Sequence, residues 1–158
     1  GTVFGQRPQL WYHLPAVDTF LLFGKIFELD DRETKKRIEF LSEAFEIQDL
    51  LETPVRKLSL GQRMRCEVAA SLLHRPKLIL LDEPSCGLNV EETGDMSFWI
   101  RDLKTDLGIT VLMVEHDMSL VNRVSDRVIA LNYGRVIAMG SPSEVQRHPD
   151  VVAAYLGA

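Results

Sequence analysis

The chain has 158 residues, of which 46% are hydrophobic, and a formal net charge of −5 at pH 7. This length and composition suit one domain with a sizeable core and exclude a disordered chain, and the negative charge argues against a partner of nucleic acid. No apolar run is long enough to cross a bilayer, and the two cysteines lack the spacing of metal ligands, so we expect a cytosolic protein with reduced, packed cysteines.

The first part of the chain predicts one short strand followed by helices. Residues 2–4 suit the end of a strand, and turn-forming residues follow them. Apolar residues then recur at helical spacing from Pro15 to Leu29. A second helix is expected from Asp30-Asp31, because acids suit the positive end of a helix dipole. Residues 10–55 are therefore interpreted as a small helical subdomain without strands.

Another helix is expected to begin after Ser59. Ser59 followed by Gln62 three residues later matches a capping box, and an apolar stripe continues behind it. Arg63 and Glu67 are expected to pair at i,i+4 on the outer face. Gly61 is costly in a first helical turn, which makes sense if a ligand approaches the backbone there, because a helix N-terminus attracts anions. An ordinary capped helix is the alternative that this pattern leaves open.

The central feature of the sequence is an apolar run over 78–81 that leads directly into Asp82 and Glu83. An apolar run without alternation predicts a strand buried on both faces, as in a parallel sheet. Ligands of open α/β sheets bind at the carboxyl ends of such strands. Mg²⁺ on a phosphate ligand uses only one or two protein carboxylates, and a second acid is then free to polarise water. A turn with two solvated acids is the alternative.

The rest of the chain alternates between helices and strands. We expect a long helix opened by Glu91 and Glu92, and a second buried strand over 109–114 that ends beside His116. A short helix, a hairpin around Asn132-Tyr133-Gly134 and terminal helices follow. Strands that alternate with helices predict an α/β fold with a right-handed parallel core.

Several of these segments together resemble the nucleotide-binding domain of ABC transporter ATPases, in the family's order and over essentially the whole chain. The segments similar to family motifs are the Q-loop glutamine Gln6, the signature at Leu58-Ser59-Leu60-Gly61-Gln62, Walker B at 78–82 with the catalytic glutamate Glu83 after it, the D-loop at Gly87-Leu88-Asn89, and the switch histidine His116. Leu60 replaces the first glycine of the signature, and Asn89 replaces the usual aspartate of the D-loop.

The resemblance implies a role for each of these residues. Asp82, with Gln6, would hold Mg²⁺, Glu83 would orient or deprotonate the attacking water, and His116 would contact the γ-phosphate. The residues implied to contact nucleotide are Gln6, Ser59, Leu60, Gly61, Gln62 and Asn89. ATP and Mg²⁺ are the implied cofactors. The implied partners are a second ABC ATPase domain, paired head to tail, and a transmembrane permease that holds the protein on the inner face of the cell membrane.

The implied fold is a truncated P-loop NTPase-like parallel sheet core with an inserted all-helical subdomain and a C-terminal β-hairpin plus helices. The expected segments are a Q-loop segment at 1–9, a helical subdomain with the signature helix at 10–76, an α/β core with Walker B, D-loop and switch motifs at 77–140, and C-terminal helices at 141–158.

The sequence contains no Gly-x-x-x-x-Gly-Lys-Ser/Thr, the loop that binds phosphates in this family, because Gly24-Lys25 is followed by Ile26. We therefore expect the chain to be the C-terminal two-thirds of an ABC ATPase domain with Walker A upstream. By itself it is expected not to hydrolyse ATP, and to self-associate through exposed apolar edges.

The two halves of the chain resemble different branches of the family. Residues up to about Pro84 look like ATPases of export transporters, whereas residues from about Cys86 are similar to ATPases of branched-chain amino-acid importers, so a hybrid is one interpretation and the cargo stays open. The leading hypothesis is an ATP-hydrolysing transporter subunit. The alternatives are a soluble ABC ATPase of DNA repair or translation, and a non-catalytic remnant that lends only its signature and D-loop surfaces to a partner.

Overall fold

The structure is a computed structural model that describes residues 1–156. The chain divides into two compact units between Glu115 and His116. The first unit contains β1 (Thr2–Phe4), α1 (Ala16–Ile26), α2 (Asp31–Ala44), the 3₁₀ turns η1 (Gln48–Leu50) and η2 (Val55–Lys57), α3 (Leu60–Ser71), β2 (Leu78–Asp82), α4 (Val90–Thr105) and β3 (Thr110–Val114). The expected order of helices, strand, helix and strand is confirmed.

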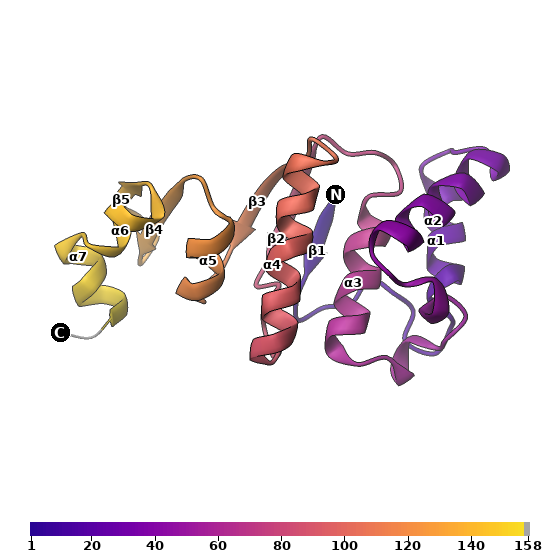
Figure 1. Cartoon of the computed structure of the whole chain (residues 1–158), viewed down its shortest axis with the longest axis horizontal. Helices are drawn as coiled ribbons and strands as arrows, with labels where there is room; N and C mark the ends of the chain where they lie inside the picture. The colour runs from indigo at the N-terminus through magenta and orange to yellow at the C-terminus, as the bar shows by residue number, and fades with distance from the viewer. Residues whose placement is uncertain (157–158) are drawn as a thin grey trace. The chain divides into compact units, whose positions relative to one another are not determined.

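The sheet of the first unit is parallel, with the order β1-β2-β3. Val3 lies opposite Leu81, and Leu81 lies opposite Met113. Both crossovers run in the same direction along the sheet, so right-handed connections put their helices on one face. Accordingly, α3 contacts β1 and α4 contacts β3 (Figure 1). Val3, Ile79 and Leu81 are buried. The predicted α/β fold with a parallel sheet is thus confirmed.

The opposite face of this sheet also carries apolar side chains, but they are exposed. The exposed fractions are 49% for Leu78, 55% for Leu112 and 52% for Val114. The prediction that β2 is buried on both faces, and that β3 is a buried strand, is therefore wrong for the described residues, because the helices of residues 1–115 pack against the other face.

The helical segment between β1 and β2 forms its own small core around Phe20, Leu41 and Ile47, which are fully buried. In Figure 1, α1 and α2 lie on the side of α3 away from the sheet. Asp30 caps α2 by accepting the Glu33 N–H at 2.7 Å. The expected helices are thus confirmed, and α3 lies between the sheet and the helical core (Figure 1).

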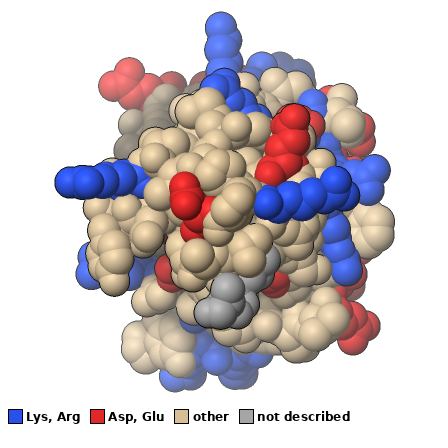
Figure 2. Space-filling model, turned by 90° about the vertical axis from the view of Figure 1, so that its left-hand side faces the viewer, with Lys and Arg blue, Asp and Glu red and all other residues tan. Residues whose placement is uncertain are grey.

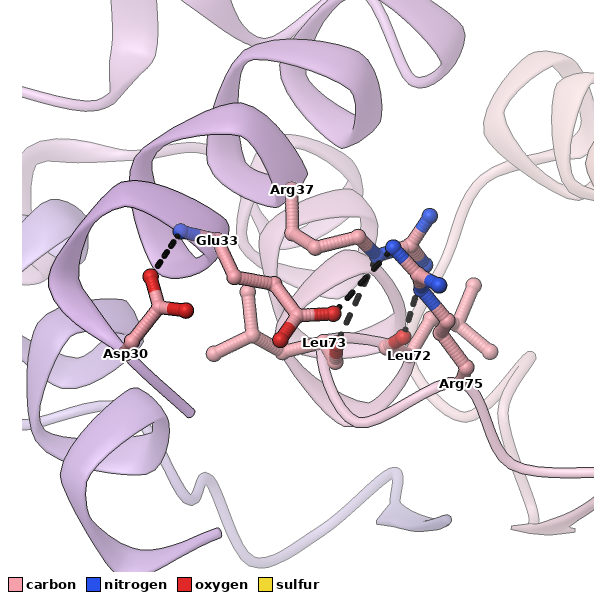
Figure 3. Close-up of polar contacts among 6 residues, drawn as sticks. All are labelled: Asp30, Glu33, Arg37, Leu72, Leu73 and Arg75. Carbon is pink, nitrogen blue, oxygen red and sulfur yellow. Dashed lines mark hydrogen bonds and ion pairs between the residues drawn. The ribbon is translucent and has the colours of Figure 1, made fainter. Parts of the chain in front are cut away.

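The C-terminal end of α3 is fixed by side chains of α2 and of the following loop (Figure 3). The Arg37 guanidinium donates to the carbonyl oxygens of Leu72 at 3.0 Å and Leu73 at 3.4 Å. Arg75 forms an ion pair with Glu33 at 3.3 Å. The last carbonyls of a helix need such donors, so α2 holds the end of the signature helix in place.

The second unit contains α5 (Met118–Val124), β4 (Val128–Asn132), β5 (Arg135–Gly140), α6 (Pro142–Gln146), α7 (Pro149–Val151) and the π-helical turn η3 (Val152–Leu156). The predicted hairpin is confirmed: Asn132 pairs with Arg135, and Tyr133 and Gly134 have φ of 48° and 75°, as a tight two-residue turn requires. The buried hairpin residues Ala130 and Ala138 form one core cluster with Val145 of α6 and Val151 of α7.

The surface shown in Figure 2 carries lysines, arginines and acids scattered among uncharged residues, without one continuous basic patch. Within residues 1–156, every helix is too short or too polar to span a bilayer.

Candidate functional site

The three residues predicted to surround a metal-bound nucleotide, Gln6, Asp82 and Glu83, meet at the carboxyl ends of β1 and β2. The Gln6 side-chain Nε2 donates to Glu83 Oε2 at 2.7 Å. A pocket of about 360 Å³ is lined by these three residues together with Phe4 and Arg7. The structure therefore brings together side chains that are 77 positions apart in the sequence.

Backbone hydrogen bonds fix the ends of the three strands against one another. The Gly5 N–H donates to the Asp82 carbonyl at 2.8 Å, and the Glu83 N–H donates to the Val114 carbonyl at 2.8 Å. Glu83 has φ of 47°, in the left-handed region that residues other than glycine seldom adopt. Such strain persists only where surrounding contacts hold it, and it is typical of functional sites.

The loop after Glu83 is held by contacts within the first unit. The Ser85 N–H donates to Glu115 Oε1 at 2.8 Å, so the residue after β3 supports this loop. Gly87 has φ of 77°, and a Cβ there would lie 2.9 Å from Leu60 Cδ2. Leu60, which replaces a glycine of the family signature, thus packs against the predicted D-loop.

The signature segment begins α3 with a complete capping box, as predicted. The Ser59 hydroxyl accepts the Gln62 N–H at 3.1 Å, and Gln62 Oε1 accepts the Ser59 N–H at 2.9 Å. Gly61 is buried in the first turn of this helix. Here the cost of glycine in a helix has a visible reason, because a Cβ on Gly61 would lie 2.7 Å from a carboxylate oxygen of Glu92.

Glu92 connects the signature to the D-loop, a contact that the sequence analysis missed. Asn89 Oδ1 accepts the Glu92 N–H at 2.9 Å, and Glu92 Oε2 accepts the Asn89 N–H at 3.2 Å, which completes a second capping box at the start of α4. The other carboxylate oxygen, Oε1, accepts the Gly61 N–H at 3.2 Å and the Ser59 hydroxyl at 3.4 Å. The spacing from Asn89 to Glu92 signals the cap, but the bridge to Gly61 depends on tertiary packing.

Glu67 corrects another prediction. It was expected on the outer face of its helix, paired with Arg63, but its exposed fraction is 3%. Its carboxylate accepts the Gln9 N–H at 2.9 and 3.1 Å and the Leu10 N–H at 3.1 Å. Burial raises the pKa of the Glu67 carboxyl, and the two backbone N–H groups and the Arg63 charge oppose that rise. Glu67 therefore joins the chain after Gln6 to the signature helix.

Replacement of Glu67 by alanine is expected to destabilise the protein by about 2–3 kcal/mol, because the buried N–H of Leu10 and the partly buried N–H of Gln9 lose their acceptor and a cavity is left. Urea unfolding followed by circular dichroism measures the change. Glu43→Ala, which removes an exposed acid from α2, is the matched control and should change stability by less than about 0.5 kcal/mol. Equal losses in the two variants would contradict the role assigned to Glu67.

The same carboxyl predicts a dependence of stability on pH. Because its pKa is raised in the folded state, the native protein holds this proton more tightly than the unfolded chain does. The contribution of Glu67 to stability therefore falls as the pH rises from the ordinary carboxyl pKa through the raised one. The free energy of unfolding of Glu67→Gln, minus that of the wild type, should increase over that range. A difference that stays constant, or that decreases, would contradict this assignment.

His116 is the first residue of the second unit, and it is exposed. Asp117 caps the helix that follows by accepting the Ser119 N–H at 2.8 Å and the Leu120 N–H at 3.3 Å. The assignment of His116 as the switch histidine stays a prediction.

Among residues 1–156, no three histidine, cysteine, aspartate or glutamate side chains are grouped as a protein-only metal site would require.

Burial raises the pKa of the Cys66 thiol to about 12, and this cysteine on α3 is fully buried, as expected for a packing residue.

Family models match both ends of the chain. Residues 1–86 match the model described as ABC transporter, and residues 135–158 match the model described as branched-chain amino acid ATP-binding cassette transporter. The second match supports the resemblance of the last part to ATPases of branched-chain amino-acid importers. The resemblance of the first half to export ATPases stays a prediction.

Curated relatives agree with these matches. The chain is 36% identical over 131 residues to the high-affinity branched-chain amino acid transport ATP-binding protein BraF of Pseudomonas aeruginosa. This match covers 83% of this chain and 51% of BraF. It is 40% identical over 100 residues to LivG, a protein of the same description from Escherichia coli K12. That match covers 63% of this chain and 39% of LivG. The chain thus spans about half the length, or less, of these relatives.

Solved structures share the fold. The structure of cbiO1 from Clostridium perfringens, part of the ABC transporter complex cbiONQ, has a TM-score of 0.83 at 30% identity over 97% of this chain and 61% of that one. An ATP-binding cassette of an ABC transporter in its ADP conformation has a TM-score of 0.83 at 26% identity, over 100% of this chain and 69% of that one. With the family model matching more than half of its residues, the chain belongs to the ABC transporter family.

Proposed function

We propose that this chain is part of an ATP-binding and ATP-hydrolysing subunit that powers transport across a membrane. The observation that carries the proposal is the hydrogen bond of 2.7 Å between Gln6 and Glu83, beside Asp82, at the carboxyl ends of neighbouring parallel strands. Ligands of open α/β sheets bind at this edge, and the family match gives the ligand class.

The donor set at this edge suits Mg²⁺ bound to nucleotide. Asp82 offers a carboxylate and Gln6 an amide oxygen, and both line the same pocket. Magnesium takes oxygen ligands and commonly binds through one or two carboxylates plus phosphates, so a site with few protein ligands is appropriate. When bound, Mg²⁺ would neutralise charge on the phosphates.

Glu83 is the proposed general base. Its side chain accepts a hydrogen bond from the Gln6 amide, which fixes one carboxylate oxygen. A carboxylate positioned in this way is able to orient a water molecule and take its proton. Gln6 is then a positioning residue that couples this base to the segment after β1. His116 is proposed to contact the transferred phosphate.

The signature and the D-loop are proposed to meet a nucleotide held by a second ABC ATPase domain, in a head-to-tail pair. Ser59 supplies a hydroxyl, Gly61 a backbone N–H at a helix start, and Gln62 and Asn89 hold the two caps. A transmembrane permease is the proposed second partner, which would hold the subunit at the inner face of the cell membrane. The exposed aromatics Trp11 and Tyr12 lie in the segment after Gln6 and are candidates for that contact.

The relatives suggest the cargo. BraF and LivG are described as branched-chain amino acid transport proteins, and the last residues of this chain match the corresponding family model. We therefore propose branched-chain amino acids as the substrate class.

The exposed apolar face of the sheet supports the expected self-association of the chain when it is produced alone.

A second candidate is a non-catalytic segment that lends its signature and D-loop to a partner. It is favoured by one contact, the Glu92 carboxylate that accepts the Gly61 N–H with one oxygen and the Asn89 N–H with the other. The bridge through Glu92 makes the signature and the D-loop one connected surface, as this role requires.

One experiment separates the two candidates. The chain is fused behind a strand–loop–helix segment that carries Gly-x-x-x-x-Gly-Lys-Ser/Thr from an ABC ATPase, and phosphate release from ATP is measured with and without Mg²⁺. An ATPase subunit shows hydrolysis that depends on Mg²⁺. Binding of ATP without any hydrolysis would favour the non-catalytic segment.

A further inference from the structure

The N-terminus of the signature helix already carries an anion from its own chain. Glu92 Oε1 lies 3.2 Å from the Gly61 nitrogen and 3.4 Å from the Ser59 hydroxyl oxygen, and both groups donate to it. Gly61 is buried, and a Cβ on it would collide with the same carboxylate at 2.7 Å. The first turn of α3 is thus shaped around this carboxylate.

These donors are the groups that the proposed function directs at a phosphate. A hydroxyl and a backbone N–H at a helix start form an anion site, and one site of this size does not hold two anions at low cost. We propose that Glu92 is an internal stand-in for the partner's nucleotide, an autoinhibitory contact that closes the signature until an ATP-loaded domain displaces it. The proposal rests on the proposed function of the signature.

The second oxygen of Glu92 makes the displacement reversible. Oε2 accepts the Asn89 N–H at 3.2 Å, and the Glu92 N–H donates to Asn89 Oδ1 at 2.9 Å. When Oε1 leaves Gly61, this cap is able to remain and keep the start of α4 intact. Release of Oε1 therefore opens the Gly61 N–H and the Ser59 hydroxyl to the partner, while Leu60 still packs against the predicted D-loop.

Glu92→Gln separates charge from capping. Glutamine at this position supports a capping box as glutamate does, with its carbonyl oxygen toward Asn89. The amide then lacks the negative charge, and its NH₂ group does not accept the Gly61 N–H. The matched control is Glu91→Gln, which removes the same charge from the neighbouring exposed position in the same helical turn.

The test measures association of the full chain with an ABC ATPase domain that carries Gly-x-x-x-x-Gly-Lys-Ser/Thr and is loaded with ATP, together with the amide resonance of Gly61. Removal of one like charge from a phosphate site is expected to tighten association about tenfold. Glu92→Gln should do this and shift the Gly61 resonance, whereas Glu91→Gln should do neither.

The outcomes separate the inference about Glu92 from the proposed function of the signature. If the wild type binds the ATP-loaded domain and Glu92→Gln binds equally or more weakly, the inference is overturned while the proposed function stands. An unchanged Gly61 resonance in Glu92→Gln also overturns the inference. If neither the wild type nor Glu92→Gln binds in an ATP-dependent way, the proposed function of the signature fails, and the inference fails with it.

Discussion

Glu83→Gln should lower ATP hydrolysis by about 10²- to 10⁴-fold in the domain completed with a phosphate-binding segment, because the side chain loses the ability to take a proton from water. Glutamine has nearly the same size and keeps an oxygen that accepts the Gln6 N–H, so the hydrogen bond of 2.7 Å between Gln6 and residue 83 is able to form in the variant. Stability and ATP affinity should therefore change little. Phosphate release under saturating ATP measures the loss.

Glu91→Gln is the control for this variant, since it removes an exposed acid from α4 and changes the net charge by the same amount. It should hydrolyse ATP at the wild-type rate. Hydrolysis by Glu83→Gln within a factor of about two of the wild type would remove Glu83 from the role of general base, and another group would have to be sought in the same pocket.

Gly5→Ala is expected to have the second large effect, on the geometry that brings Gln6 to Glu83. A Cβ on Gly5 would lie 2.1 Å from the carbonyl oxygen of Glu83 and 2.9 Å from its carbonyl carbon. These are backbone atoms directly after β2, which hydrogen bonds hold against its neighbouring strands, so they are not free to yield as a side chain would. The two strand ends must separate, which we expect to cost about 1–3 kcal/mol.

The Gly5 variant should also lose the contact between Gln6 and Glu83, and with it activity of the completed domain. Gly94→Ala is the matched control, because a Cβ on Gly94 meets nothing within 4 Å and the residue lies inside α4. Alanine there should stabilise the protein by about 0.5–1 kcal/mol. Urea midpoints of the two variants compare them directly, and a Gly5 variant as stable as the wild type would contradict the close approach of these strands.

Local patterns predicted much of the fold. The capping residues Ser59 and Gln62, the strand that ends at Asp82, and the turn at Tyr133-Gly134 each follow from residues within a few positions of one another. These features depend on short-range geometry, which the sequence displays directly.

The errors arise where distant segments meet. Glu67 shows the helical spacing of a surface acid, and only the passage of residues 9–10 over α3 buries it. Glu92 signals a helix cap, and only the packing of α4 beside α3 brings it to Gly61. The apolar run over 78–81 does not reveal that one of its faces lies open in residues 1–115. Side-chain type and spacing carry no information on such tertiary contacts.

The most direct test of the central claim uses the signature surface in trans. The chain is titrated into an ABC ATPase domain that carries Gly-x-x-x-x-Gly-Lys-Ser/Thr but has a disabled signature, and phosphate release is recorded at each ratio. We expect hydrolysis to rise with the amount of chain, to saturate, and to be lost when Ser59 is replaced by a residue too large for the site. A flat titration with no ATP-dependent association would contradict it.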